Sequence, residues 1–282
     1  MNATLLDFSE RRELARHARV IADVQQVTSA LRAPTMITGA FARDLHVFYA
    51  YGLDANRQSE DVDFAIAVRD WHAFAEIRTQ LASSGSFRTS PGLDHRLYHS
   101  AGLPIDLVPF QGVETQSRKI EWPPAGEIVM DVFGFSEALA AAQSVRLPDG
   151  VDATVVSLPA LALLKLVAWQ DRHLRSPRKD AHDLMLIASS YLELGNAERL
   201  WNEFSTWTDD ENFDYQRAGG RMLGHDIRTL VDARGAGKLA TILEAQSSET
   251  VPGPLPEEMS RLDPGRARML LAGILSGVTE RR

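Results

Sequence analysis

The hydrophobic pattern of this chain changes near residue 157, and that change limits the possible folds more than any other feature. Before it, short apolar segments that alternate in steps of two lie between helical segments. After it, apolar residues recur at steps of three and four, as they do in amphipathic helices. We therefore expect an α+β chain. It has a mixed-sheet α/β domain with an N-terminal helix over residues 1–157 and an α-helical C-terminal domain over residues 158–282.

Within the first domain, the pattern places helices between strands. Strands are predicted over residues 35–38, 61–68, 87–90, 96–99, 104–110 and 153–157. Helices are predicted over residues 10–31, 40–51 and 71–82, with a polar loop at 52–59. In the second domain, the clearest helices are predicted over residues 158–174 and 178–194. Because the later strands of the first domain are close enough in sequence to pair as hairpins, we expect the sheet to be mixed.

Composition excludes several classes of function. The chain contains no cysteine, which rules out disulfides, thiolate zinc sites and cysteine nucleophiles. The net charge is −8, whereas a protein that coats DNA is normally basic. The first ten residues do not resemble a signal peptide, and no apolar segment reaches the ~18 residues that a membrane span needs. We therefore expect a cytoplasmic protein with no membrane contact.

Two acids in one strand are the most informative local feature. Asp61 and Asp63 lie two residues apart, so their side chains should point to one face of the strand, roughly 6.6 Å apart along it. Carboxylates this close repel each other, and a divalent cation that both can bind removes the repulsion. Magnesium prefers such oxygen ligands. The alternative is an edge strand with two solvated acids.

A third acid interrupts an otherwise apolar strand. Asp106 lies within residues 104–110, and a buried carboxylate without a partner costs several kcal/mol. If this strand neighbours that of Asp61 and Asp63, the three carboxylates converge. The alternative is a single capping or hydrogen-bonded aspartate.

Two further segments suggest phosphate contacts. Gly39 separates a short strand from a helix, where it would let the backbone approach a ligand and leave helix N–H groups free for phosphate. Lys165 lies in an apolar helix and either reaches solvent or projects into a cleft. Residues 165–180 contain five Lys or Arg against two Asp, a local excess that could receive a triphosphate or an RNA backbone. An ordinary solvated helix surface is the alternative, with Asp180 and Asp183 in ion pairs.

Taken in this order, these segments resemble the AbiEii-type nucleotidyltransferases of the DNA polymerase β-like superfamily, many of which are toxins of toxin–antitoxin pairs. The resemblance is carried by residues 39–44, 57–64, 105–110, 161–172 and 178–184. It implies a polymerase β-like nucleotidyltransferase domain. It also implies a Mg²⁺-dependent enzyme that moves a nucleoside monophosphate from an NTP to an acceptor hydroxyl.

The resemblance also implies roles for individual residues. It assigns Asp61, Asp63 and Asp106 to magnesium, with Asp106 also the candidate base, and Asp180 to a later acidic motif. It assigns the nucleotide to Gly39, Ala40, Arg43, Ser59 and Lys165. One departure is Ala40, because the family often has a serine there whose hydroxyl can reach a phosphate.

The acceptor stays open at this point. The resemblance implies tRNA 3′ ends or a protein side chain, together with a cognate antitoxin protein as a partner. One alternative is a small-molecule acceptor, as in aminoglycoside nucleotidyltransferases. Another is a non-catalytic member that binds a nucleotide or a partner protein.

Overall fold

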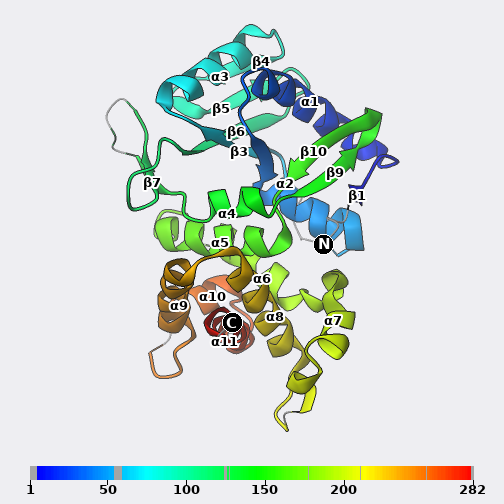
Figure 1. Ribbon diagram of the computed structural model, residues 1–282, viewed down its shortest axis with the longest axis vertical. Helices are drawn as coiled ribbons and strands as arrows, with labels where there is room; N and C mark the ends of the chain where they lie inside the picture. The colour runs from blue at the N-terminus through cyan, green and yellow to red at the C-terminus, as the bar shows by residue number, and fades with distance from the viewer. Residues whose placement is uncertain are drawn as a thin grey trace. The chain divides into compact units, whose positions relative to one another are not determined.

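The computed structural model describes residues 5–53, 59–123, 126, 128–176, 178–209, 211–251 and 253–280. The chain forms two compact units, residues 1–157 and 158–282 (Figure 1). The boundary between them lies where the hydrophobic pattern changes. Most of the expected loop at 52–59, and the first two residues of the 57–64 motif, lie outside the described residues.

The first unit is built around an eight-stranded sheet with the order β1-β9-β10-β2-β3-β6-β5-β4. Its strands are β1 (Leu6–Asp7), β2 (Thr35–Thr38), β3 (Val62–Val68), β4 (Phe87–Ser90), β5 (Leu93–His99), β6 (Pro104–Gln111), β9 (Gln143–Leu147) and β10 (Val151–Val155). Strand β3 runs antiparallel to β2 and parallel to β6, so the expected mixed sheet is confirmed. A second sheet pairs β7 (Lys119–Glu121) with β8 (Val129–Asp131).

Strand β3 shows why the sheet forms at this point in the sequence. Val62, Phe64 and Ile66 are at most 1% exposed, because alternate residues of a strand point to one face and this face is covered. Burying each of these side chains contributes roughly 1.5–3 kcal/mol. Asp63 alternates with them and is half-buried on the opposite face. The apolar residues therefore stabilise a strand that carries an acid.

The helices of the first unit largely follow the predicted segments. They are α1 (Ala15–Ala30), α2 (Gly39–Asp44), α3 (Trp71–Ser83) and α4 (Phe135–Ala140). Short turns are η1 (Arg12–Leu14) before α1, a π-helical turn η2 (Leu45–Tyr49) after α2, and η3 (Pro148–Gly150). The helix α3 begins at an Asp70 cap, whose Oδ1 accepts a hydrogen bond of 2.7 Å from the Ala73 N–H.

Several elements of the first unit were not expected from the sequence, namely β1, β7, β8, β9 and α4. Strand β9 explains why. Only Val145 and Leu147 of its five residues are buried, so its own apolar signal is weak. It becomes a strand because the turn η3 folds it back onto β10, where Ala153 lies opposite Val145.

The second unit is helical, as predicted. Its helices are α5 (Leu158–Arg172), α6 (Lys179–Ser189), α7 (Ala197–Asn202), α8 (Tyr215–Leu230), α9 (Ala233–Ser247), α10 (Leu255–Met259) and α11 (Pro264–Thr279). Two short turns, η4 (Leu192–Asn196) and η5 (Ser205–Asp209), flank α7. Trp169 of α5 is 1% exposed and therefore lies in the core of this unit. No helix in the described part of the chain has the length and hydrophobicity that a bilayer crossing requires.

Helices α8 and α11 pack backbone against backbone. The contact is lined by Gly220 and Gly224 of α8 and by Gly273 and Gly277 of α11. A Cβ on Gly224 would lie 2.1 Å from the Ile274 carbonyl oxygen, which is well inside van der Waals contact. The absence of side chains at these positions therefore allows the two helices to approach this closely.

This packing predicts opposite effects for two glycine-to-alanine changes. Gly224→Ala should lower the free energy of unfolding by roughly 2–4 kcal/mol, because overpacking outweighs the gain in helix propensity. Gly237→Ala, in α9, has no atom within 4 Å of the new Cβ and should raise it by about 0.5–1 kcal/mol. Urea denaturation followed by circular dichroism measures both. A Gly224→Ala variant as stable as the parent would contradict the packing.

Candidate active site

Three acids meet on adjacent strands of the first unit. Strand β6 lies beside β3, and the Cα of Asp63 pairs with the Cα of Asp106. Asp61 comes immediately before β3, two residues from Asp63, and therefore lies toward the same face. The side chains of Asp61 and Asp106 are 20% and 15% exposed. Because β3 and β6 are neighbours, the three acids lie close together, as the sequence predicted for that case. Their roles stay a prediction.

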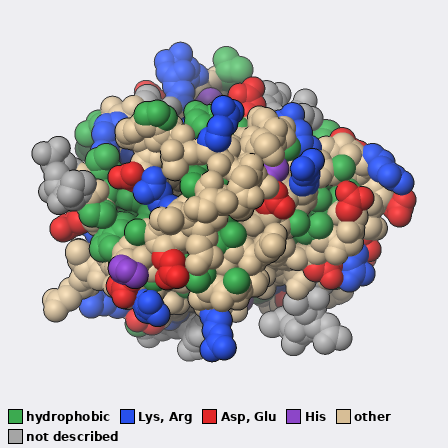
Figure 2. All heavy atoms as spheres, turned by 90° about the horizontal axis from the view of Figure 1, so that it is seen from above, with side chains coloured by type: hydrophobic (Ala, Val, Ile, Leu, Met, Phe, Trp, Pro, Cys, Tyr) green, Lys and Arg blue, Asp and Glu red, His purple; other side chains and the backbone are tan. Residues whose placement is uncertain are grey.

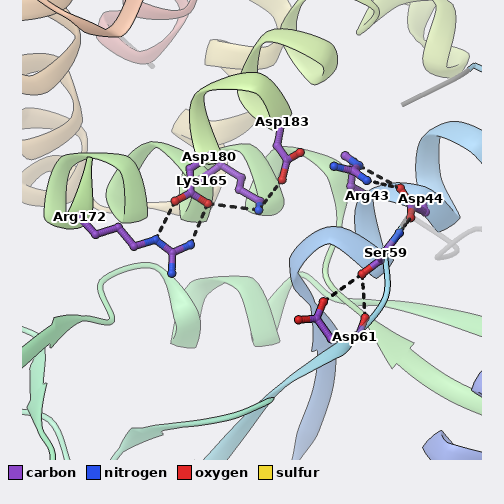
Figure 3. Close-up of polar contacts among 8 residues, drawn as sticks. All are labelled: Arg43, Asp44, Ser59, Asp61, Lys165, Arg172, Asp180 and Asp183. Carbon is purple, nitrogen blue, oxygen red and sulfur yellow. Dashed lines mark hydrogen bonds and ion pairs between the residues drawn. The ribbon is translucent and has the colours of Figure 1, made fainter. Parts of the chain in front are cut away.

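The segment before β3 is held by a chain of hydrogen bonds (Figure 3). Ser59 Oγ donates to the carbonyl oxygen of Asp61 at 2.8 Å and to its Oδ1 at 3.2 Å. The Ser59 N–H donates to Asp44 Oδ2 at 2.8 Å. Arg43 Nε and Nη2 donate to the other oxygen of Asp44 at 3.0 and 2.5 Å. Ser59 therefore links the buried Arg43–Asp44 pair to the first of the three acids.

The position of Arg43 bears on its expected role. Arg43 is 2% exposed and Asp44 is 3% exposed. A guanidinium buried beside a carboxylate is well suited to fixing that carboxylate. In this structure Arg43 acts on the site through Asp44 and Ser59, which sequence analysis did not connect.

Gly39 lies directly against the carboxylate of Asp63. It begins α2 with a φ of +70°, and a Cβ there would lie 1.7 Å from Asp63 Oδ2. Any side chain at this position would displace that carboxylate. The following residue, Ala40, is 2% exposed. The glycine therefore makes room for one of the three acids.

Arg96 is the site residue that sequence analysis missed. It lies on β5, where its Cα pairs with that of Asp106. Its Nε and Nη2 donate to Asp106 Oδ1 and Oδ2 at 2.7 and 2.5 Å, and Nη2 also donates to Asp61 Oδ2 at 3.2 Å. The hydrogen bonds to Asp106 contribute most to a pKa of Arg96 that lies above its ordinary value. Partial burial opposes this rise, and the negative charges of Asp106 and Asp61 add to it. The short hairpin between the predicted strands 96–99 and 104–110 is the signal that could have revealed the pairing.

The donor chemistry at this position fits a hard divalent cation, because carboxylate oxygens are the ligands that Mg²⁺ prefers. As the side chains stand, no group of three or more His, Asp or Glu in the described residues is arranged to hold a metal ion. The Arg96 guanidinium binds both carboxylate oxygens of Asp106 and one of Asp61. The carboxylates therefore have the chemistry that binds Mg²⁺. In this structure, those of Asp61 and Asp106 are hydrogen-bonded to Arg96.

A second polar cluster lies within the helical unit (Figure 3). Lys165 of α5 is 5% exposed, and its Nζ lies 3.3 Å from Asp180 Oδ1 and 2.6 Å from Asp183 Oδ2, both on α6. Arg172 Nε and Nη2 donate to Asp180 at 2.8 and 2.9 Å. Burial alone would raise the pKa of Asp180, but the bonds from Arg172 and the charge of Lys165 outweigh it and lower that pKa.

This cluster refines the sequence hypotheses for its members. The alternative in which Asp180 forms ion pairs is observed, and its partners are Lys165 and Arg172. Lys165 is neither solvated nor isolated. On the face shown in Figure 2, which looks at the molecule of Figure 1 from above, Lys and Arg side chains lie scattered among Asp and Glu side chains.

Clustered acids on neighbouring strands of a sheet are compatible with nucleotide transfer, and the class of this protein, the nucleotidyltransferases, is shown by its family. Over residues 24–260 the sequence matches the family described as "Nucleotidyl transferase AbiEii toxin, Type IV TA system". The chain belongs to this family, which confirms the resemblance seen in its motifs. No curated protein matches the sequence.

Solved structures similar to this chain are distant. An antigenic nucleotidyltransferase-like protein from Paracoccidioides brasiliensis shares 19% identity with a TM-score of 0.40, covering 68% of this chain and 88% of that one. The antibiotic-resistance factor ANT(2'')-Ia shares 14% identity with a TM-score of 0.36, covering 67% and 91%. The CCA-adding enzyme of Thermotoga maritima, complexed with tRNA, shares 12% identity with a TM-score of 0.25, covering 95% and 81%. Similarity this low assigns neither substrate nor acceptor.

Proposed function

We propose that this protein is a Mg²⁺-dependent nucleotidyltransferase that moves a nucleoside monophosphate from an NTP to an acceptor hydroxyl on tRNA or a protein. We further propose that it works in the cytoplasm, where NTPs are supplied, as the toxin of a toxin–antitoxin pair. The observation that carries this proposal is the pairing of Asp63 with Asp106 across adjacent strands, with Asp61 on the same face.

The proposed reaction makes a bond from the acceptor oxygen to the α-phosphorus of the NTP. It breaks the bond from that phosphorus to the bridging oxygen, so pyrophosphate leaves and the hydroxyl proton is lost. Asp61, Asp63 and Asp106 are the residues that would hold Mg²⁺, which when bound neutralises phosphate charge. Asp106 is also our candidate to accept the proton. It can do so only when Arg96 is not hydrogen-bonded to both of its oxygens.

Nucleotide binding is divided among the other candidate residues. Gly39, Ala40 and Lys165 are proposed to serve the triphosphate, with Lys165 supplying positive charge. Ser59 and Arg43 are proposed as positioning residues, because their hydrogen bonds hold Asp61 in place. Asp180 is proposed to act through Lys165, since it is buried and binds that ammonium group.

The proposal is tested by transfer of label. The purified protein is incubated with each of the four [α-³²P]NTPs and MgCl₂, and with total tRNA, a protein extract or an aminoglycoside as acceptor. We expect label in tRNA or protein that disappears with EDTA. Label only in the aminoglycoside would establish the small-molecule alternative. Nucleotide binding without any transfer would establish a non-catalytic member.

A further inference from the structure

Arg96 occupies the position where the acids of two strands converge. Its guanidinium binds both oxygens of Asp106 and one oxygen of Asp61, with the distances given above. The Arg96 side chain is 27% exposed, so the pair is neither fully solvated nor sealed in the core. One cation therefore already bridges the two strands that are proposed to bind Mg²⁺.

The physical reason for this arrangement is mutual repulsion of the acids. Three carboxylates on one face destabilise the sheet unless a positive charge lies among them. A guanidinium supplies that charge permanently, because arginine keeps its proton throughout the physiological pH range. It therefore leaves the acids by moving away, and not by losing its charge.

Arg96 and a divalent ion would both approach the oxygens of Asp61 and Asp106, and their positive charges repel each other at that distance. Arg96 uses its planar donors on oxygens that a divalent ion would need. Binding of the ion and pairing of Arg96 with Asp61 and Asp106 therefore compete directly.

We propose that Arg96 is an internal counter-cation, which holds Asp61 and Asp106 together when no divalent ion is bound and must release them before the ion binds. This inference rests on the proposed function, because it takes those acids as ligands for the metal. Arg96 is then a positioning residue, and its presence weakens binding of a divalent ion to Asp61 and Asp106. Its release also frees Asp106 to accept a proton.

The test measures binding of Mn²⁺ to the metal-free, nucleotide-free full chain by isothermal titration calorimetry. Arg96→Gln should bind Mn²⁺ about tenfold more tightly than the parent, because charge-assisted bonds no longer have to be broken. Arg96→Lys keeps the charge but cannot form two parallel bonds, so its affinity should lie between the two. Arg88→Gln, which removes an exposed arginine from β4 of the same sheet, should bind as the parent does.

Thermal unfolding provides a second measurement that needs no activity. Without metal, Arg96→Gln should unfold at a lower temperature than the parent. Adding Mn²⁺ should raise its unfolding temperature by more than it raises that of the parent. A merely structural ion pair would give the first effect without the second.

The outcomes separate the two proposals. If the parent binds Mn²⁺ and Arg96→Gln binds it no more tightly, the counter-cation is refuted and the proposed function stands. If neither protein binds Mn²⁺, the counter-cation is refuted, and the proposed function is decided by the transfer assay with NTP. Tighter binding by Arg88→Gln as well would also refute the specific role of Arg96, since any lost positive charge would then suffice. If Arg96→Gln does not fold, the comparison of Arg96→Lys with the parent decides. Tighter Mn²⁺ binding by Arg96→Lys supports the counter-cation, and equal or weaker binding refutes it.

Discussion

Replacing Asp63 with asparagine should reduce nucleotidyl transfer by about a thousandfold or more while leaving the sheet folded. Asparagine has nearly the same shape, so it can occupy the space that Gly39 leaves beside the carboxylate. It lacks the negative charge with which Asp63 would hold a divalent ion. The free energy of unfolding should stay within about 1 kcal/mol of the parent.

The measurement is Mg²⁺-dependent transfer from [α-³²P]NTP, with urea denaturation of the same preparations. Asp94→Asn is a matched control on the same sheet. Asp94 is 61% exposed and pairs with Arg78 at the surface, so its loss should leave transfer unchanged. Transfer at the parent rate by Asp63→Asn would remove Asp63 from the metal site.

Replacing Lys165 with methionine should have two effects with different origins. It leaves the buried carboxylates of Asp180 and Asp183 without their shared ammonium group, which should lower the free energy of unfolding by about 3–5 kcal/mol. It should also reduce transfer by about a hundredfold, because a positive charge proposed to act on the triphosphate is lost. Lys179→Met is the control, since Lys179 is exposed at the start of α6.

A double variant distinguishes these origins. Lys165→Met combined with Asp183→Asn removes one of the two buried charges, so it should regain part of the lost stability. It should regain none of the lost transfer, because the ammonium group is still absent. If transfer recovers together with stability, Lys165 serves the fold alone. Parent stability and parent transfer in Lys165→Met would contradict both roles.

Local patterns were sufficient to predict the core of the sheet. The segments at 35–38 and 62–68 are strands because their apolar residues alternate strongly, and the Asp70 cap starts α3 as its sequence indicates. Strand β9 was not predicted, because its five residues carry little apolar signal and pairing with β10 supplies its stability.

The candidate site divides in the same way. The three acids were predicted because a carboxylate within an apolar strand is costly and requires a partner. The hairpin between residues 96–99 and 104–110 indicates that these strands pair, but the register that places Arg96 opposite Asp106 is set by the folded sheet. Asp44 was missed for a related reason, because its bond to Ser59 joins segments that local periodicity does not relate.

The order of residues along the chain was enough to predict the class of fold and the positions of the acids, which depend on periodicity and spacing, local properties of a sequence. Membership of the AbiEii family follows from the match over residues 24–260. The partners of those acids were decided by folding: Gly39 against Asp63, Arg96 between Asp61 and Asp106, and Lys165 between Asp180 and Asp183. Buried and half-buried charges are paired by whatever the packing brings within hydrogen-bond distance, and that distance is a property of three dimensions.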